Sequence, residues 1–132
     1  METKLDSLKN LVAIIDDEPN IRETASFILE LEGYDVITAC NGEEAIDLLR
    51  KEKPKIVLLD VMMPKKNGYE VCAEVKADPV LKDIYVVMLT AKGQKMDKEK
   101  AMQVGADRYM TKPFDDEEIL QILEKLFQER VN

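Results

Sequence analysis

The sequence predicts an α/β fold in which helices cover both faces of a parallel β-sheet. Five short apolar runs alternate with five amphipathic segments along the 132 residues. Strict alternation of this kind favours parallel strands joined by right-handed helical crossovers. Several runs are β-branched and nearly free of polar residues, which is typical of strands covered on both faces. The length fits one domain that buries a substantial core.

The expected strands are short, and four of them stand out clearly from their surroundings. LVAII, DVITA, IVLL and IYVVML predict strands at residues 11–15, 35–39, 56–59 and 84–89. The run RYM gives a weaker fifth strand at residues 108–110. The chain shows no internal repeat and no linker, so the five units are expected to form a single sheet.

The helices are predicted from apolar spacing and from their ends. Pro19 suits the first turn of a helix, and Gly33 suits its end. Within that helix one face is apolar: Ile21, Ala25, Ile28 and Leu29. Gly105 is expected to end a shorter helix near residues 96–104. The last helix has a wide apolar stripe: Ile119, Ile122, Leu123, Leu126 and Phe127. Three further pairs have capping-box spacing: Asn41 with Glu44, Asn67 with Glu70, and Asp115 with Glu118.

The amino-acid composition disfavours several classes of binding partner. With 19 basic and 27 acidic residues the formal charge is −8, which disfavours direct binding to nucleic acid or an anionic membrane surface. No apolar stretch is long enough for a membrane span, and no signal peptide is evident. Cys40 and Cys72 lack metal-site spacing, so free thiols in a cytoplasmic protein are expected. Residues 1–10 are interpreted as a polar lead-in and residues 11–130 as the domain.

The absence of histidine excludes several kinds of chemistry. The chain contains no histidine, so it has no histidine base, no histidine metal ligand and no phosphohistidine of its own. Any reactive group must therefore be a carboxylate, an amine, a hydroxyl or a thiol.

Reactive side chains follow four of the predicted strands. Asp16 and Asp17 follow the first, Asp60 the third, Thr90 the fourth and Lys112 the fifth. Ligands of such sheets bind beyond the carboxyl ends of the strands, so these residues are expected to converge. Three carboxylates together repel one another. One lysine and one divalent cation would neutralise them, and a set of oxygen donors favours Mg²⁺ or Mn²⁺.

Each of these residues also has a purely structural explanation. Asp16 and Asp17 could cap the following helix and interact with its dipole. Thr90 is an ordinary residue for a strand end, and a lysine at position 112 is commonly solvated. Asp60 favours the metal site, because IVLLD repeats the unusual step from a buried strand into a carboxylate.

Four motifs, in order and at matching strand ends, give the chain a family resemblance. IIDDE at 14–18, LLDVMMPKKNG at 58–68, LTA at 89–91 and TKPF at 111–114 carry it. The chain resembles the receiver domain of two-component response regulators, chemotaxis regulators included, over roughly residues 10–130. The resemblance implies a flavodoxin-like, doubly wound (βα)5 fold with strand order 2-1-3-4-5.

The resemblance also implies a role for the acids. Asp60 would accept a phosphoryl group from a phosphohistidine on a sensor histidine kinase or phosphotransfer protein. Asp17, Asp60 and the backbone oxygen of Met62 would bind Mg²⁺ directly, and Asp16 would bind it through water. A carboxylate is a workable nucleophile, and phosphoryl transfer chiefly requires positioning and charge neutralisation.

The remaining implied roles concern phosphoryl binding and switching. Thr90 and the N–H of Ala91 would bond one phosphoryl oxygen, and Lys112 would pair with another. Thr90 and Tyr109 would turn inward and reshape the surface of the fourth helix, fifth strand and fifth helix. Without the resemblance, Tyr109 could equally be an ordinary half-buried strand residue. The chain would then be a signalling switch, not an enzyme beyond its own phosphorylation and dephosphorylation.

Some positions depart from the family or are particular to this chain. Lys66 and Asn67 stand where relatives often carry an apolar residue and Asp, and Lys92 lies where family members tune dephosphorylation. A run of lysines makes the start of the fourth helix basic: Lys92, Lys95, Lys98 and Lys100. It is interpreted either as a solvated face or as a surface for an acidic partner.

Three other functions compete with that of a receiver domain. A dehalogenase-type phosphatase needs an acid where Met62 stands, and a flavodoxin needs a Ser/Thr/Gly-rich loop in place of DDEPN. A receiver-like module that is never phosphorylated is left open, although the intact acids, Thr90 and Lys112 argue against it. The output would be a downstream protein partner or a domain absent from this chain.

Overall fold

The computed structural model describes residues 10–91, 95–112 and 115–131. Over these residues the chain forms one five-stranded sheet of parallel strands in the order β2-β1-β3-β4-β5, which confirms the predicted fold and strand order. The elements are β1 (Leu11–Ile15), α2 (Pro19–Leu31), β2 (Asp35–Ala39), α3 (Gly42–Glu52), β3 (Ile56–Asp60), α4 (Gly68–Ala77), β4 (Tyr85–Ala91), α5 (Lys95–Gln103), β5 (Arg108–Lys112) and α6 (Asp116–Val131). None of the described helices is long and apolar enough to cross a membrane.

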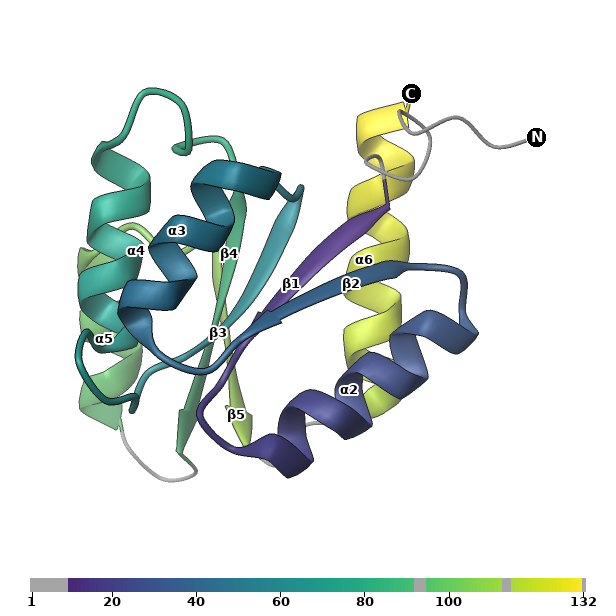
Figure 1. Ribbon diagram of the computed structural model, residues 1–132, viewed down its shortest axis with the longest axis horizontal. Coiled ribbons are helices and arrows are strands. Elements are labelled where there is room, and N and C mark those ends of the chain that lie inside the picture. Colours follow the sequence, from purple (N-terminus) through teal and green to yellow (C-terminus); the bar gives the residue numbers. More distant parts are fainter. Residues whose placement is uncertain (1–9, 92–94, 113–114, 132) are drawn as a thin grey trace.

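Helices cover both faces of the sheet, as the apolar strands predicted. Helices α3, α4 and α5 lie on one face, and α2 and α6 lie on the other (Figure 1). Side chains of β1 alternate between the two layers: Ala13 and Ile15 pack beneath α3 and α4, and Val12 and Ile14 pack beneath α2 and α6. Every residue of β1 is buried. Polar residues therefore occur only after the end of this strand, at Asp16 and Asp17.

The helix starts follow the predicted caps in part. Pro19 is the first residue of α2, and Asn67 and Glu70 form a complete capping box at α4. Asn41 accepts a hydrogen bond from the N–H of Glu44 (2.9 Å), whose carboxylate instead accepts from the Cys40 thiol (3.5 Å). At α6, Asp115 caps the helix by accepting a hydrogen bond from the N–H of Glu117 (2.9 Å).

Three strands extend beyond their apolar runs. β3 includes Asp60, β4 runs from Tyr85 to Ala91 and β5 continues to Lys112. The ladder pairs Asp60 with Leu89 and Ala91 with Lys112. Backbone hydrogen bonds continue a strand whatever the polarity of its side chains. The apolar pattern therefore predicted carboxyl ends for these strands that are one or two residues too early. Asp60, Thr90 and Lys112 therefore belong to strands of the sheet, whereas Asp16 and Asp17 follow β1.

The two cysteines are expected to differ in reactivity. Cys72 of α4 is fully buried, and burial raises the pKa of its thiol to about 11. Cys40, after β2, is half-buried. Because the thiolate is the reactive form, we expect iodoacetamide at neutral pH to modify Cys40 and spare Cys72. Peptide mapping by mass spectrometry would measure this, with protein in denaturant as the control in which both react. Equal labelling of the folded protein would contradict the buried placement of Cys72.

Candidate functional site

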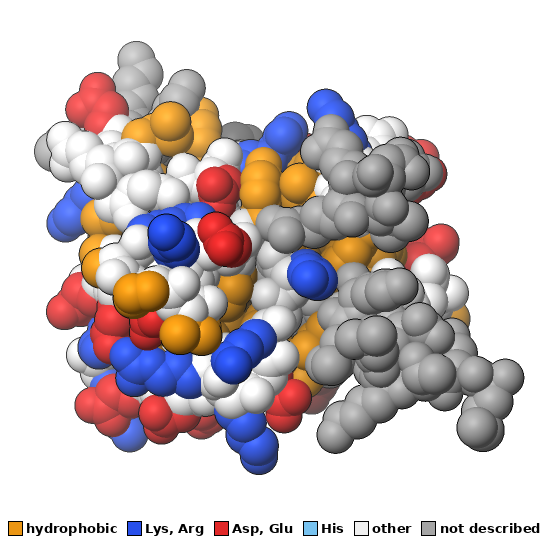
Figure 2. Space-filling model, turned by 90° about the horizontal axis from the view of Figure 1, so that it is seen from above, with side chains coloured by type: hydrophobic (Ala, Val, Ile, Leu, Met, Phe, Trp, Pro, Cys, Tyr) orange, Lys and Arg blue, Asp and Glu red, His pale blue; other side chains and the backbone are white. Residues whose placement is uncertain are grey.

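Three side chains from three strands meet at the carboxyl edge of the sheet. Asp16 follows β1 and is fully buried, and Asp60 at the end of β3 is 5% exposed. The ammonium of Lys112 at the end of β5 lies 2.7 Å from Asp16 Oδ2 and 3.0 Å from Asp60 Oδ1. The lysine thus lies between two buried carboxylates. Figure 2 shows the opposite face, at the amino ends of the strands, where basic and acidic side chains are interspersed.

Asp16 is fixed by contacts to its backbone and side chain. Its N–H donates to the Ala39 carbonyl (3.1 Å), and its own carbonyl accepts from Arg22 Nη1 (2.7 Å). Its Oδ1 accepts from the N–H of Glu18 (2.9 Å). Among the described residues, its buried Oδ2 accepts no hydrogen bond of good geometry, although it forms the ion pair with Lys112. One oxygen of Asp16 thus binds the start of α2, as a structural role would require, and the other faces the site.

The sequence reasoning missed one acid of the site. Carboxylate oxygens of Asp16, Asp17 and Glu18 all lie within 4.8 Å of one another. No role in the site is predicted for Glu18 from the sequence, but its Oε1 lies 3.5 Å from Lys112 Nζ. The signal was the run of three consecutive acids. Arg22 was also missed, because the sequence gives no sign that it bonds the carbonyl of Asp16.

The site has an excess of negative charge, because its carboxylates outnumber its one lysine. The pKa of Asp60 is raised to about 6, chiefly by burial and also by Asp16 and Asp17, although Lys112 lowers it. Burial lowers the pKa of Lys112, but its close ion pairs with Asp16 and Asp60 outweigh burial, so its pKa is raised. The acids hold the lysine charged, and one lysine does not neutralise them. A divalent cation would complete the balance.

Thr90 lies near the carboxyl end of β4, whereas Tyr109 lies near the start of β5, opposite Met88. Thr90 is buried in β4, and its hydroxyl donates to the Met110 carbonyl of β5 (3.3 Å). Tyr109 is half-buried and packs against the core layer beneath α3, α4 and α5. Ala91 ends β4 beside Lys112, which places its backbone N–H at the carboxyl edge.

The loop after β3 turns sharply around Met62. Val61 and Met63 are buried, whereas the Met62 side chain is 71% exposed. Gly68 closes the loop by donating its N–H to the Val61 carbonyl (2.9 Å). A Cβ at Gly68 would lie 2.9 Å from the carbonyl carbon of Asp60 and overlap its oxygen. Only glycine lets α4 begin so close to the end of β3.

Several predicted positions lie outside the described part of the chain. Lys92, Pro113 and Phe114 are among them, as are residues 1–9 of the predicted lead-in. The side chains of Lys95 and Lys98 are likewise not described. The basic surface therefore stays a prediction from the sequence.

The residues present fit a hard divalent cation. The donors are carboxylate oxygens, and Asp16 offers a buried oxygen without a hydrogen bond of good geometry. Oxygen donors without histidine or cysteine suit Mg²⁺ or Mn²⁺. A cation here would also stabilise the ionised form of Asp60 against the effect of burial.

Curated relatives match most of the chain. The protein called "Probable transcriptional regulator ycf27" of Porphyra purpurea is 44% identical over 115 residues, covering 87% of this chain and 46% of that protein. A protein of the same name from Guillardia theta is 44% identical over 111 residues, covering 84% of this chain and 42% of that protein. The chain thus matches somewhat less than half the length of these relatives.

Solved structures agree with the fold. The signal receiver domain of a signal transduction histidine kinase from Syntrophus aciditrophicus is 32% identical, with a TM-score of 0.85 and coverage of 91% of each chain. The chemotaxis response regulator CheY4 of Vibrio cholerae is 32% identical, with a TM-score of 0.81, covering 88% of this chain and 97% of that one. The BeF3-activated receiver domain of RstA from Klebsiella pneumoniae is 25% identical, with a TM-score of 0.82 and coverage of 89% and 98%.

A family profile gives the most direct assignment. The profile of the response regulator receiver domain matches residues 12–124, which include every element from β1 to the middle of α6. The strand order, the acids at the ends of β1 and β3 and the lysine at the end of β5 agree with this match. The chain therefore belongs to the response regulator receiver domain family.

Proposed function

We propose that this chain is a phosphoacceptor switch of a two-component system. Asp60 accepts a phosphoryl group from a phosphohistidine on a sensor histidine kinase or a phosphotransfer protein. The observation that carries this proposal is the pair of buried carboxylates, Asp16 and Asp60, held 2.7 and 3.0 Å from one lysine ammonium. A structural ion pair needs one carboxylate, whereas this site concentrates negative charge around a nucleophile.

Asp17, Asp60 and the Met62 carbonyl would hold Mg²⁺ directly, and Asp16 would hold it through water; Mn²⁺ can substitute. When bound, the ion orients the phosphoryl oxygens and neutralises their charge. An oxygen of Asp60 attacks the phosphorus as the phosphorus–nitrogen bond of the donor breaks. The electron pair of that bond stays on the imidazole nitrogen, which takes up a proton.

Three groups of this chain act on the phosphoryl oxygens. Lys112 forms an ion pair with one of them, in place of its present ion pair with Asp16. The hydroxyl of Thr90 and the N–H of Ala91 bond another, which requires Thr90 to leave the Met110 carbonyl that it now contacts at 3.3 Å. The chain thereby catalyses only its own phosphorylation and dephosphorylation.

The switch follows from this exchange of partners. Phosphorylation raises the negative charge at position 60 to about −2 at neutral pH. Thr90 turns toward the phosphoryl group, Tyr109 moves into the vacated space, and the surface of α5, β5 and α6 changes. A separate protein partner, or an output domain outside this chain, reads that surface. We place the protein in the cytoplasm, without direct binding to nucleic acid or membrane.

Phosphate uptake tests the proposal. We expect wild-type protein, incubated with Mg²⁺ and acetyl phosphate, to gain the mass of one phosphoryl group, and Asp60→Asn to gain none. Intact-protein mass spectrometry measures both. Beryllofluoride provides an independent test, since it should shift the amide NMR signals of β4 and β5 in the wild type alone. No uptake from any donor would instead favour a binding module that is never phosphorylated.

A further inference from the structure

We propose that helices α3 and α4 clamp the loop after β3, and that this clamp sets the affinity of the site for divalent cations. The clamp consists of Gly42, Lys66, Glu74 and Arg50, and none of them has a role in the phosphoryl transfer proposed above. They are positioning residues, since they act through the loop that carries the Met62 carbonyl. The inference rests on the proposed function, because it assumes that this carbonyl is a cation ligand.

One side of the clamp is a direct backbone contact. Gly42 is the buried first residue of α3. A Cβ at this position would overlap the carbonyl oxygen of Lys66 and lie 2.6 Å from its carbonyl carbon. Asn41 caps the same turn through the N–H of Glu44, which fixes where Gly42 stands. The start of α3 therefore limits how far the loop can move toward β2.

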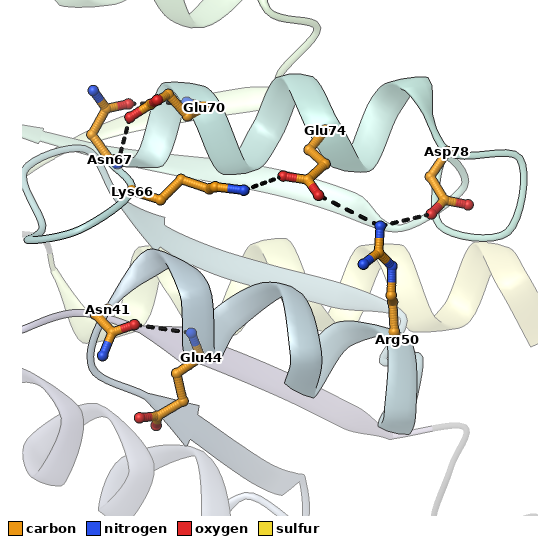
Figure 3. A network of polar contacts seen from close by, with 8 residues as sticks. All are labelled: Asn41, Glu44, Arg50, Lys66, Asn67, Glu70, Glu74 and Asp78. Atoms are coloured by element: carbon orange, nitrogen blue, oxygen red, sulfur yellow. Dashed lines mark hydrogen bonds and ion pairs between the residues drawn. The ribbon is translucent and has the colours of Figure 1, made fainter.

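The other side of the clamp is an ion-pair chain. The ammonium of Lys66 lies 2.6 Å from Glu74 Oε2 in α4, and Arg50 of α3 lies 3.5 Å from Glu74 Oε1. Arg50 also lies 3.6 Å from Asp78 at the end of α4. Figure 3 shows Glu74 between the two cations, one from the loop and one from α3. About a third of the side chains of Lys66 and Glu74 is exposed, so the pair is partly screened by solvent.

The loop needs such support because its backbone is strained next to Lys66. Lys65 has φ 69°, in the left-handed region that disfavours residues other than glycine. A conformation of this kind persists only where the surrounding contacts over-determine it. Lys65 also lies within four residues of Met62, so a loop that relaxes at this corner would move the Met62 carbonyl.

Mg²⁺ affinity, measured apart from phosphorylation, tests the inference. The stabilisation of the folded protein as a function of Mg²⁺ concentration gives the dissociation constant, and amide NMR shifts of residues 61–67 give it independently. We expect Gly42→Ala to weaken Mg²⁺ binding at least about tenfold, because a ligand displaced by a fraction of an ångström loses most of its contribution. We expect Lys66→Met to weaken it about two- to fivefold, in keeping with a partly exposed ion pair.

Gly33→Ala is the matched control. Gly33 has φ 93°, so alanine is strained there, but a Cβ would have no atom within 4 Å. It lies between the end of α2 and Asp35, the first residue of β2, and therefore near the amino ends of the strands. This variant should lose stability and keep the Mg²⁺ affinity of the wild type.

The outcomes separate the inference from the proposed function. If Gly42→Ala folds and binds Mg²⁺ as tightly as the wild type, the clamp has no role in the site. If Gly42→Ala does not fold, Lys66→Met, Glu74→Gln and the double variant decide: equal weakening in all three supports the pair, and unchanged affinity in all three overturns it. A wild-type protein that binds no Mg²⁺ would contradict the proposed function instead.

Discussion

Asp17→Ala is expected to abolish Mg²⁺-dependent phosphorylation of Asp60 while the chain keeps its fold. Asp17 is exposed and follows β1 outside the core, so its truncation removes no packing. Its carboxylate oxygen lies within 4.8 Å of oxygens of Asp16 and Glu18, and it is proposed as a direct Mg²⁺ ligand. Losing it removes both a ligand and the charge that attracts the ion, and we expect uptake to fall by at least about 10²-fold.

The measurement compares three proteins under identical conditions. Uptake from acetyl phosphate is followed by intact mass across a range of Mg²⁺ concentrations, and circular dichroism reports the fold. Glu30→Ala is the control, because Glu30 is an exposed acid of α2 near the opposite end of the helix. Wild-type uptake by a folded Asp17→Ala variant would overturn the assignment of Asp17 as a metal ligand. If Glu30→Ala also lost uptake, the effect of Asp17→Ala would be due to the change in net charge and not to the loss of a metal ligand.

The sequence predicted the architecture because the architecture depends on patterns that are local. Alternating apolar runs define strands buried on both faces, and their carboxyl ends must share one edge. That geometry alone brings Asp16, Asp60 and Lys112 together, as the 2.7 and 3.0 Å contacts of the lysine show. The strand ends were less predictable, because a polar residue such as Thr90 can continue a ladder that apolar spacing does not reveal.

The parts of the site that sequence reasoning missed depend on contacts between distant segments. The hydroxyl of Thr90 bonds the carbonyl of Met110, twenty residues away, and no local pattern encodes that choice. Gly42 reads as an ordinary residue after a helix cap, yet it lies against Lys66. Glu18 approaches Lys112, which stands 94 residues later in the sequence, and no local pattern predicts that contact.

Asp60→Asn is expected to be more stable than the wild type at pH 7 in the absence of divalent ions. Burial raises the pKa of Asp60 from its ordinary value of 3.8 to about 6. Between these values the folded chain therefore holds more protons than the unfolded chain, so the contribution of this group to stability falls as pH rises from about 4 to 6. A difference of about two pKa units corresponds to about 3 kcal/mol above that window. The pKa of about 6 already includes the stabilising ion pair with Lys112, so the uncharged Asn side chain should gain up to about 3 kcal/mol at pH 7.

Urea denaturation in EDTA at several pH values measures this difference. The advantage of the variant should be present at pH 7 and vanish below about pH 4, where Asp60 becomes protonated in both the folded and the unfolded chain. Saturating Mg²⁺ should reverse the order, because it stabilises only the protein that binds it. Asp47→Asn, at an exposed position of α3, should show neither effect. A variant less stable than the wild type at pH 7 in EDTA would mean that Lys112 already neutralises the site. The demand for a cation, on which the proposed phosphoacceptor depends, would then lose its physical basis.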